Sequence, residues 1–189
     1  MSWYEQESKK QRSIHDQLQE ISMSPIEAIW TGEEPDTQFV RLELPHNPYS
    51  SGVLSTEPDG SRVMMGVELK VPEALRNQGI GKRLVSGLIV LAQKYDAQEF
   101  QADVTSEHSL NAIRGLTGDN ILRFSDPELG QFPREVPITA EQAVQSLKRA
   151  SIFESDLDHR DISFVVKLDM ADVNISGWEQ PYEHNTPSF

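Results

Sequence analysis

Residues 62–95 change from the hydrophobic period of a strand to that of a helix. In residues 63–71 an apolar side chain occupies every second position, as in a half-buried strand. In residues 80–95 apolar side chains recur at steps of three and four, which is the buried stripe of a helix. Residues 98–104 are expected to form the next strand. This part of the chain is therefore predicted as strand, loop, helix and strand.

The pattern before residue 62 predicts two helices and two strands. Ser2 starts a capping box and a helix that runs to about residue 21. Ser24-Pro25 is expected to begin a second, short helix that ends near Trp30. The strands expected before the turn at residues 58–60 are 38–44 and 52–56.

The last third of the chain predicts a helix, a strand and an end without a pattern. Thr139 and Gln142 belong to a second capping box, and residues 162–168 alternate like a strand. No periodicity survives beyond these elements, so about 173–189 are expected to form a loose tail unless its aromatic side chains pack back. No linker or repeat divides the chain, which predicts one α/β domain over residues 1–189.

The loop between the predicted strand and helix reads Arg76-Asn77-Gln78-Gly79-Ile80-Gly81-Lys82. Its two glycines allow a sharp turn and a close approach of a ligand to the backbone. The first amides of a helix have no acceptor within the helix, so they and the helix dipole can face an anion. Arg76, Lys82 and Arg83 add positive charge in a chain with a formal net charge of -13. The loop is therefore predicted to hold a phosphate or diphosphate.

Two common phosphate-binding motifs do not fit this loop. A Walker loop ends in Gly-Lys-Ser/Thr, which is absent here. The dinucleotide fingerprint fits Gly79 and Gly81 but has Leu84 in place of its third glycine, although Glu99 lies at a suitable distance for a ribose contact. A nucleotide-binding α/β protein is therefore kept only as a distant hypothesis.

The pattern that fits is Arg/Gln-x-x-Gly-x-Gly/Ala, which Arg76, Gly79 and Gly81 meet after a lead-in from Val71. This pattern resembles the acyl-CoA loop of the GNAT superfamily of N-acetyltransferases, and the resemblance covers roughly residues 62–112. It implies a mixed, mostly antiparallel twisted sheet with helices on both faces. It also implies that two strands splay apart at the acyl-CoA site.

The resemblance further implies direct transfer of an acetyl or other acyl group from acetyl-CoA to a primary amine, without a metal. Pantetheine would lie between the splayed strands, and the loop amides would receive the diphosphate. The residues implied to bind acetyl-CoA are Leu69, Lys70, Val71, Arg76, Asn77, Gln78, Gly79, Ile80, Gly81, Lys82 and Asn111.

The catalytic groups depart from the family pattern. The Tyr that usually protonates the departing thiolate falls at Leu116, and the Asn of the motif Asn-x-x-Ala falls at Ser109, with Asn111 as the alternative in a shifted helix. A base is needed because most alkylamines are protonated at neutral pH. Glu68 on the predicted strand is the candidate base, and its alternative role is a surface pair with Lys70 or Arg62.

Other titratable residues offer further hypotheses. Glu107 and His108 follow the next strand and could act through water. Residues 156–161 contain three Asp and a His, but they lack the glycine and terminal Glu of a calcium loop, so a solvated acidic loop is expected. The acids among residues 33–36 could line an entrance for the acceptor.

Composition limits the class of protein. A chain of 189 residues can bury one ordinary core, and the absence of Cys excludes disulfides, thiolate metal sites and a Cys nucleophile. No apolar run reaches the length of a membrane helix and no signal peptide opens the chain, so a soluble cytoplasmic protein without a membrane partner is expected. The net charge argues against nucleic acid as a partner and is compatible with a cationic amine.

Two functions are therefore weighed. The first is an N-acetyltransferase that acts on a primary amine of a small molecule or a protein. The second is a catalytically inactive CoA-binding regulatory or interaction module, which Leu116 motivates. Amine-dependent turnover of acetyl-CoA separates the two. Members of the superfamily often dimerise, so the resemblance is also compatible with a homodimer.

Overall fold

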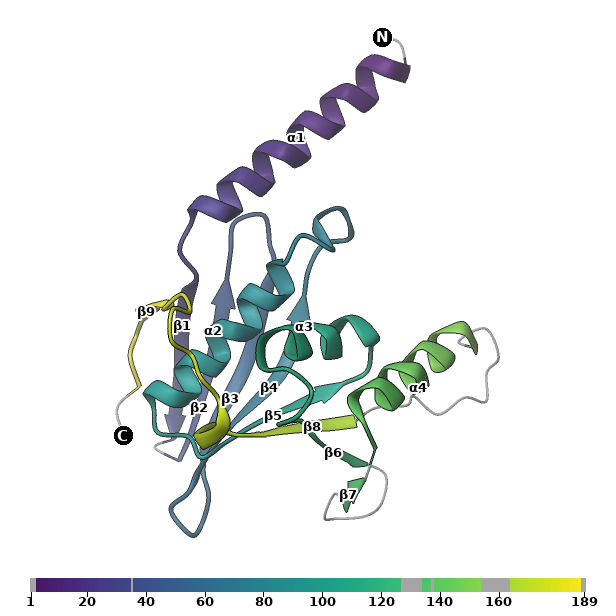
Figure 1. The fold of residues 1–189 in the computed structure, drawn as a ribbon. Helices are drawn as coiled ribbons and strands as arrows, with labels where there is room; N and C mark the ends of the chain where they lie inside the picture. The colour runs from purple at the N-terminus through teal and green to yellow at the C-terminus, as the bar shows by residue number, and fades with distance from the viewer. Residues whose placement is uncertain (1–2, 35, 127–133, 137, 154–163, 188–189) are drawn as a thin grey trace.

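The computed structural model describes residues 3–34, 36–126, 134–136, 138–153 and 164–187, and its elements are labelled in Figure 1. The helices are α1 (Trp3–Met23), α2 (Ile80–Lys94), α3 (Glu107–Thr117) and α4 (Ala140–Phe153), with 3-10 turns η1 (Glu73–Leu75) and η2 (Met170–Asp172). The strands are β1 (Glu27–Glu34), β2 (Thr37–Glu43), β3 (Tyr49–Thr56), β4 (Arg62–Lys70), β5 (Glu99–Val104), β6 (Arg123–Asp126), β7 (Arg134–Val136), β8 (Phe164–Asp169) and β9 (Tyr182–His184).

The described strands form one sheet with the order β7-β6-β8-β5-β4-β3-β2-β1-β9. Strands β1 to β4 make an antiparallel meander. Among the described strand pairs, only β4–β5 and β1–β9 are parallel. The meander leads through β4, a loop and α2 to β5, as the sequence predicts. The predicted fold class, α/β with a mixed and mostly antiparallel sheet, is confirmed.

Strands β4 and β5 pair over only part of their length. Their register ends at Gly66 opposite Ala102, although β4 continues to Lys70. At the same place the pairing of β3 with β4 shifts between Ser51 and Gly52, which marks a β-bulge. The two parallel strands therefore diverge beyond Gly66, where the sequence predicts a splay.

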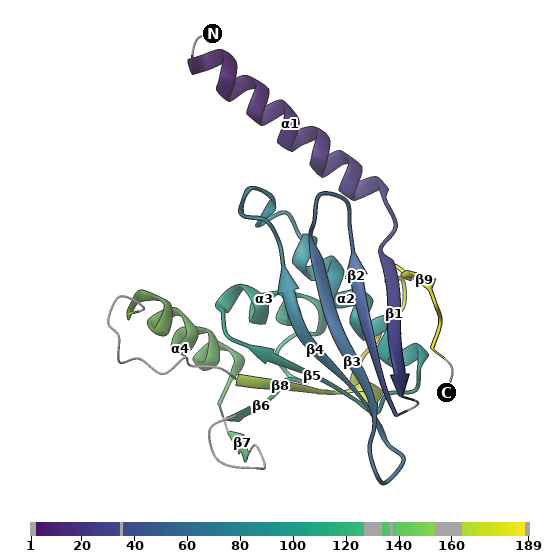
Figure 2. The same ribbon diagram turned by 180° about the vertical axis from the view of Figure 1, so that it is seen from behind.

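Helices α2 and α3 lie on one face of the sheet (Figure 1). Helix α2 buries most of its residues there, and at Gly87 an added Cβ would lie 2.8 Å from Cδ1 of Leu42. The view from behind shows no described helix over β2, β3 and β4 (Figure 2), and Phe39 and Met65 are exposed large apolar side chains of β2 and β4. On this face the described helices leave β2, β3 and β4 uncovered.

Residues 27–34 form strand β1, so the predicted short helix ending near Trp30 is wrong. Ala28 and Trp30 are buried, and β1 pairs with β2 in antiparallel register. The helix before it, α1, extends to Met23 and points away from the sheet in both views (Figures 1 and 2).

The end of the chain is part of the fold. Strand β9 pairs in parallel with β1, and Val173 is buried, so the predicted loose tail is wrong for residues 173–187. Strands β6 and β7 were also not predicted, and they extend the sheet beyond β8. The acidic segment 156–161 lies outside the described residues.

The capping box predicted before α4 is present. The Gln142 amide donates to Thr139 Oγ1 at 3.2 Å, and the Thr139 amide donates to Gln142 Oε1 at 2.8 Å. This reciprocal pair satisfies two amides at the start of the helix.

Candidate functional site

The predicted phosphate loop joins the end of β4 to the start of α2 through η1. Leu75 and Ile80 are buried and anchor the loop at both ends. Between them Asn77 and Gly79 adopt left-handed backbone, with φ of 62° and 77°. The Arg76 Nε donates to the Val71 carbonyl at 3.2 Å, which ties the loop back to the strand. Helix α2 therefore begins in a fixed orientation beside β4.

Glycine suits the two loop positions for different structural reasons. Gly79 precedes α2 in left-handed backbone, which favours glycine, although a Cβ would meet no atom within 4 Å. At Gly81 a Cβ would lie 3.5 Å from Leu69 Cδ2 and 3.8 Å from Val71 Cγ2, which are ordinary contacts. Because Gly81 has no side chain, space stays free at the first turn of α2, beside the last residues of β4.

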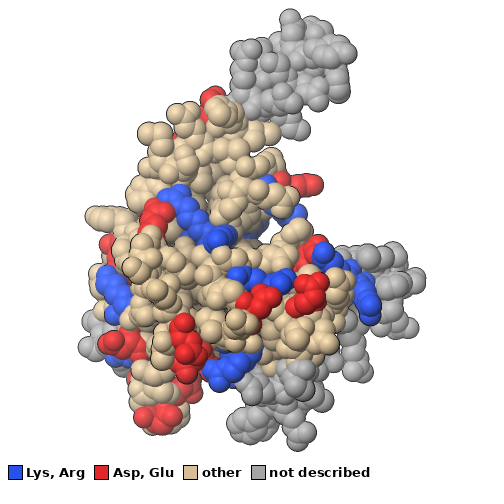
Figure 3. Space-filling view, in the orientation of Figure 1, with Lys and Arg blue, Asp and Glu red and all other residues tan. Residues whose placement is uncertain are grey.

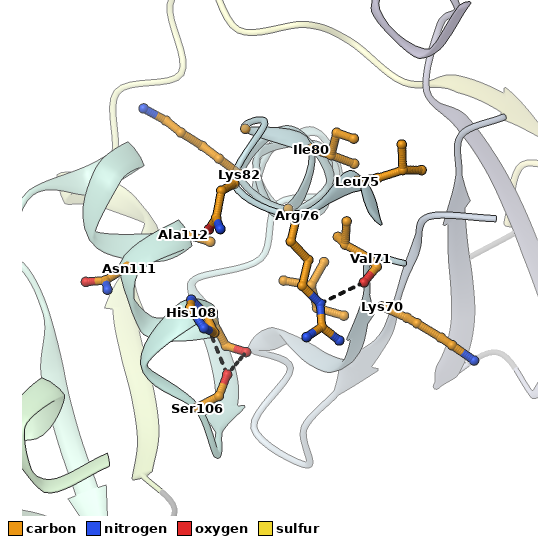
Figure 4. A pocket seen from close by; sticks show the side chains of 15 residues that line it. Lys70, Val71, Leu75, Arg76, Ile80, Lys82, Ser106, His108, Asn111 and Ala112 are labelled. Carbon is orange, nitrogen blue, oxygen red and sulfur yellow. Dashed lines mark hydrogen bonds between the residues drawn. The ribbon is translucent and has the colours of Figure 1, made fainter. Parts of the chain in front are cut away.

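A cavity of about 520 Å³ lies between this loop, the end of β4 and the start of α3 (Figure 4). We call it the first cavity. Its described lining residues are Leu69, Lys70, Val71, Leu75, Arg76, Asn77, Gly79, Ile80, Gly81, Lys82, Ser106, His108, Ser109, Asn111 and Ala112.

The charge of the first cavity is opposite to that of the chain. Lys70, Arg76 and Lys82 line it, and none of its described lining residues is acidic, whereas the chain carries a formal net charge of -13. Figure 3 shows Lys and Arg side chains around the hollow on this face. In Figure 4 the Arg76 guanidinium lies near Val71, and the Lys70 and Lys82 ammonium groups lie towards opposite sides of the view. The cavity suits an anionic ligand.

The structure brings together nearly all the residues that the sequence assigns to CoA. Every one of them lines the first cavity except Gln78, which lines a depression with Leu18 and Ile21 of α1 instead. Arg83, whose charge was also assigned to this loop, points elsewhere: its guanidinium donates to the Ile21 carbonyl and pairs with Glu179. Arg83 therefore has a structural role.

A second cavity, of about 230 Å³, lies in the splay between β4 and β5. Leu69 and Ser109 line both cavities, so the two adjoin at these residues. The other residues of the second cavity are Ser50, Gly66, Val67, Glu68, Val85, Leu88, Phe100, Ala102, Asp103, Val104, Thr105 and Ile113. The first cavity suits the anionic head of a ligand, and the adjoining second cavity suits an extended arm that lies between the two strands.

No protein-family model and no curated protein matches the chain. Among solved structures, the chain is similar to the Bacillus subtilis acetyltransferase in complex with CoA. The identity is 15%, the match covers 76% of this chain and 98% of that chain, and the TM-score is 0.43. A likeness at this level assigns neither a function nor a site residue to this chain.

Glu68, the candidate base, has a partner that the sequence did not suggest. The Tyr49 hydroxyl donates to the Glu68 carboxylate at 2.7 Å, and the Arg41 guanidinium lies 3.8 Å from the centre of the Tyr49 ring. This hydrogen bond to Glu68 raises the pKa of Tyr49, so the phenol stays a neutral donor at physiological pH. Tyr49 was missed because β3 was expected to start at Gly52.

The start of α3 brings hydroxyl groups to the border of the two cavities. Ser106 caps the helix by accepting from the Ser109 amide at 3.2 Å, and its hydroxyl lies 2.9 Å from that of Ser109. His108 lines the first cavity, whereas Glu107 pairs with Lys148 at 3.2 Å. From the sequence, Ser109 stands out only because it replaces the Asn of the motif Asn-x-x-Ala. In the structure it is the polar residue that lines both cavities.

Leu116, at the position of the usual acid, does not line either cavity. It borders a separate depression with Lys82 and Trp178. Helix α3 ends close by at Thr117, followed by Gly118 with φ of 75°. A leucine side chain has no proton to donate, so Leu116 cannot serve as an acid.

Three other hypotheses have different outcomes. Asp36 lies at the turn between β1 and β2, where its carbonyl accepts from the Thr56 amide beside the start of β4. The acceptor entrance at residues 33–36 stays a prediction. Strand β4 separates that turn from the loop by about 27 Å. Among the described residues no group of three or more His, Asp or Glu could hold a metal. No helix within the described ranges is long and apolar enough to cross a membrane.

Proposed function

We propose that this protein is an N-acyltransferase that moves an acyl group from acyl-CoA, with acetyl-CoA as the reference donor, to a primary amine. The observation that carries the proposal is the first cavity. It combines the N-terminus of α2 with three cationic side chains and adjoins a second cavity between splayed strands. CoA joins a diphosphate to an extended thiol arm, so its chemistry fits this pair of cavities.

The residues divide between binding and positioning. Amides at the start of α2 would receive the diphosphate, with Arg76 and Lys82 as neighbouring charges. Leu69 and Ser109 border the passage into the splay, where the thioester would meet the amine. Holding donor and amine in one site lowers the barrier through orientation. This arrangement supports direct transfer from donor to acceptor.

Proton removal is the remaining chemical requirement. We assign it to Glu68, which lines the second cavity and whose carboxylate accepts from Tyr49. The carboxylate takes a proton from the ammonium, and the neutral amine then attacks the thioester carbonyl. The carbon–sulfur bond breaks and its electron pair leaves with the sulfur. The nitrogen loses its second proton as the amide forms, and this proton passes to the departing thiolate to give the free thiol. Each step uses a group that the second cavity or the substrates supply.

The proposed base predicts a specific kinetic defect in Glu68→Gln. At pH 7 we expect kcat to fall about 100-fold with an unchanged Kd for acetyl-CoA, because the amide cannot accept the ammonium proton. Activity should recover as the pH approaches about 10.4, where a lysine-like amine is already neutral. The measurement is a pH profile of thiol release. Glu57→Gln, in the turn between β3 and β4, is the matched control.

A wild-type kcat for Glu68→Gln at pH 7 would remove Glu68 from the mechanism. The same result with an altered Kd for acetyl-CoA would instead give Glu68 a role in binding.

The proposal as a whole is tested by titrating the protein with acetyl-CoA in a calorimeter and then following free thiol with a panel of amines. We expect micromolar binding and amine-dependent release of thiol. Absence of binding to CoA and acetyl-CoA would overturn the proposal.

A CoA-binding regulatory or interaction module is the second candidate function, because Leu116 occupies the position of the usual acid. It predicts binding of acetyl-CoA without thiol release for any amine, small molecule or protein. Release above the rate without amine excludes this candidate.

A further inference from the structure

The face of the sheet that no described helix covers carries an apolar row across three strands (Figure 2). Phe39 of β2 is the register partner of Val53 of β3, and Val53 is the partner of Met65 of β4. Phe39 and Met65 are 51 % and 43 % exposed, and Val67, further along β4, is 57 % exposed. We call Phe39, Val53, Met65 and Val67 the sheet patch. Large exposed apolar side chains that lie together are a common mark of a surface that binds a partner.

The sheet patch leads directly to the proposed base. Val67 and Glu68 are consecutive in β4, and both line the second cavity. Glu68 lies on the uncovered face, because the next residue, Leu69, packs towards the core and side chains alternate along a strand. The first cavity, assigned to the CoA head, is lined by the starts of α2 and α3 on the other face. Donor and acceptor would therefore reach the splay from opposite faces of the sheet.

Two carboxylates stand where the uncovered face meets the second cavity. Glu68 and Asp103 both line it, and Asp103 is the exposed residue between two buried residues of β5. Among the residues that the structure describes, neither carboxylate has an ion-pair partner. Of the cations on these strands, Arg41 pairs with a carboxylate of β2, and Lys70 lines the first cavity. The mouth of the splay thus suits an ammonium group.

We propose that the acceptor is the side-chain amine of a lysine in a polypeptide that docks on the sheet patch. Apolar side chains beside that lysine would cover Phe39 and Met65, and its ammonium would enter the splay near Glu68 and Asp103. A small free amine would meet the same carboxylates but leave the sheet patch in contact with water. This inference rests on the proposed function and names its acceptor class.

The test follows thiol release from acetyl-CoA with two kinds of acceptor at equal concentrations of lysine. One is Nα-acetyl-lysine amide, and the other is a mixture of short capped peptides with one central lysine and randomised flanking positions. We expect kcat/KM to be at least about tenfold higher for the peptides, because their flanking side chains can bury apolar surface that the amide does not reach. Sequencing of the acetylated peptides should show enrichment of apolar flanking residues.

Phe39→Ser and Met65→Ser test where the peptide lies. Each removes exposed apolar surface, and neither residue lines the first or the second cavity. Each variant should lower kcat/KM for the peptides about fivefold and leave that for Nα-acetyl-lysine amide unchanged. Met23→Ser is the matched control, because Met23 is 77 % exposed but belongs to α1 instead of the sheet, and it should change neither value.

Each contrary result decides a different point. Absence of binding to CoA and acetyl-CoA overturns the proposed function together with this inference. A kcat/KM for Nα-acetyl-lysine amide equal to or above that of the peptides overturns the inference alone, as does binding of acetyl-CoA without thiol release from any peptide. A peptide preference that persists in folded Phe39→Ser and Met65→Ser also overturns it, because the peptide would then lie elsewhere. A dimer in sedimentation that either variant dissociates overturns it as well, because a second copy would then occupy the sheet patch.

Discussion

Gly81→Glu is expected to raise the Kd for acetyl-CoA at least about 100-fold, which is the loss of about 2.7 kcal/mol or more of binding free energy. The new carboxylate would stand at the first turn of α2, in the cavity assigned to the diphosphate, and like charges repel strongly at short range. The fold should survive because a Cβ at this position meets Leu69 and Val71 only at 3.5 and 3.8 Å. Calorimetry with acetyl-CoA gives the Kd.

Two variants at the same position separate size from charge. Gly81→Ala adds only the Cβ and should keep affinity within about tenfold of the wild type. Gly81→Gln has nearly the shape of Glu without its charge and should lie between the two. If folded Gly81→Glu binds acetyl-CoA with wild-type affinity, the assignment of the diphosphate to the first cavity is wrong.

Glu183→Ala is expected to destabilise the fold by about 2–4 kcal/mol. The Glu183 side chain is 8 % exposed, and its Oε1 accepts from Trp30 Nε1 at 3.0 Å and from the Tyr95 hydroxyl at 2.6 Å. Its other oxygen pairs with Lys94. Truncation to Ala would leave the indole and phenol donors without their acceptor inside the fold. Urea unfolding measures the change in free energy.

Glu183→Gln is the matched control, because one amide oxygen can still accept from both Trp30 and Tyr95. We expect it to lose about 1 kcal/mol or less, mainly through the partly exposed Lys94. A free energy of unfolding for Glu183→Ala within about 0.5 kcal/mol of the wild type would mean that β9 contributes little to stability.

The pH dependence of this contact follows from Tyr95. Burial raises the pKa of Tyr95 above its ordinary value of 10.0, so the phenol remains a donor at neutral pH. The stabilisation is therefore complete below the pKa of the unfolded chain and is lost as the pH rises through the raised pKa of the folded chain.

The elements that the sequence predicted well are those whose patterns are local. Helix α2 buries one face over many residues, so the period in residues 80–95 suffices to identify it. The alternation in residues 63–71 identifies strand β4, although the strand buries Met64 and exposes Met65 and Val67 of the face that was expected to be half-buried. The loop between them could be predicted for the same reason, because its glycines stand between two recognisable elements. Its residues then gather around one cavity with the exception of Gln78.

The elements that the sequence did not predict depend on partners far away in the chain. Strand β9 has three residues and exists because β1 offers it an edge, and β1 itself was taken for a helix because Ser24-Pro25 is a common helix start. The contact of Tyr49 with Glu68 depends on the register of β3 against β4 beyond a bulge. No local pattern carries that register.

The contacts of Arg83 bear on the order in which the parts of the chain can fold. It donates to the Ile21 carbonyl at 2.6 Å and to Glu179 at 2.6 Å, partners that lie 62 and 96 positions away in the chain. Contacts of such separation form only after long loops have closed, and proteins rich in them fold slowly. The start of α2 is thus held by segments from both ends of the described chain, and the first cavity beside it is complete only when folding is complete.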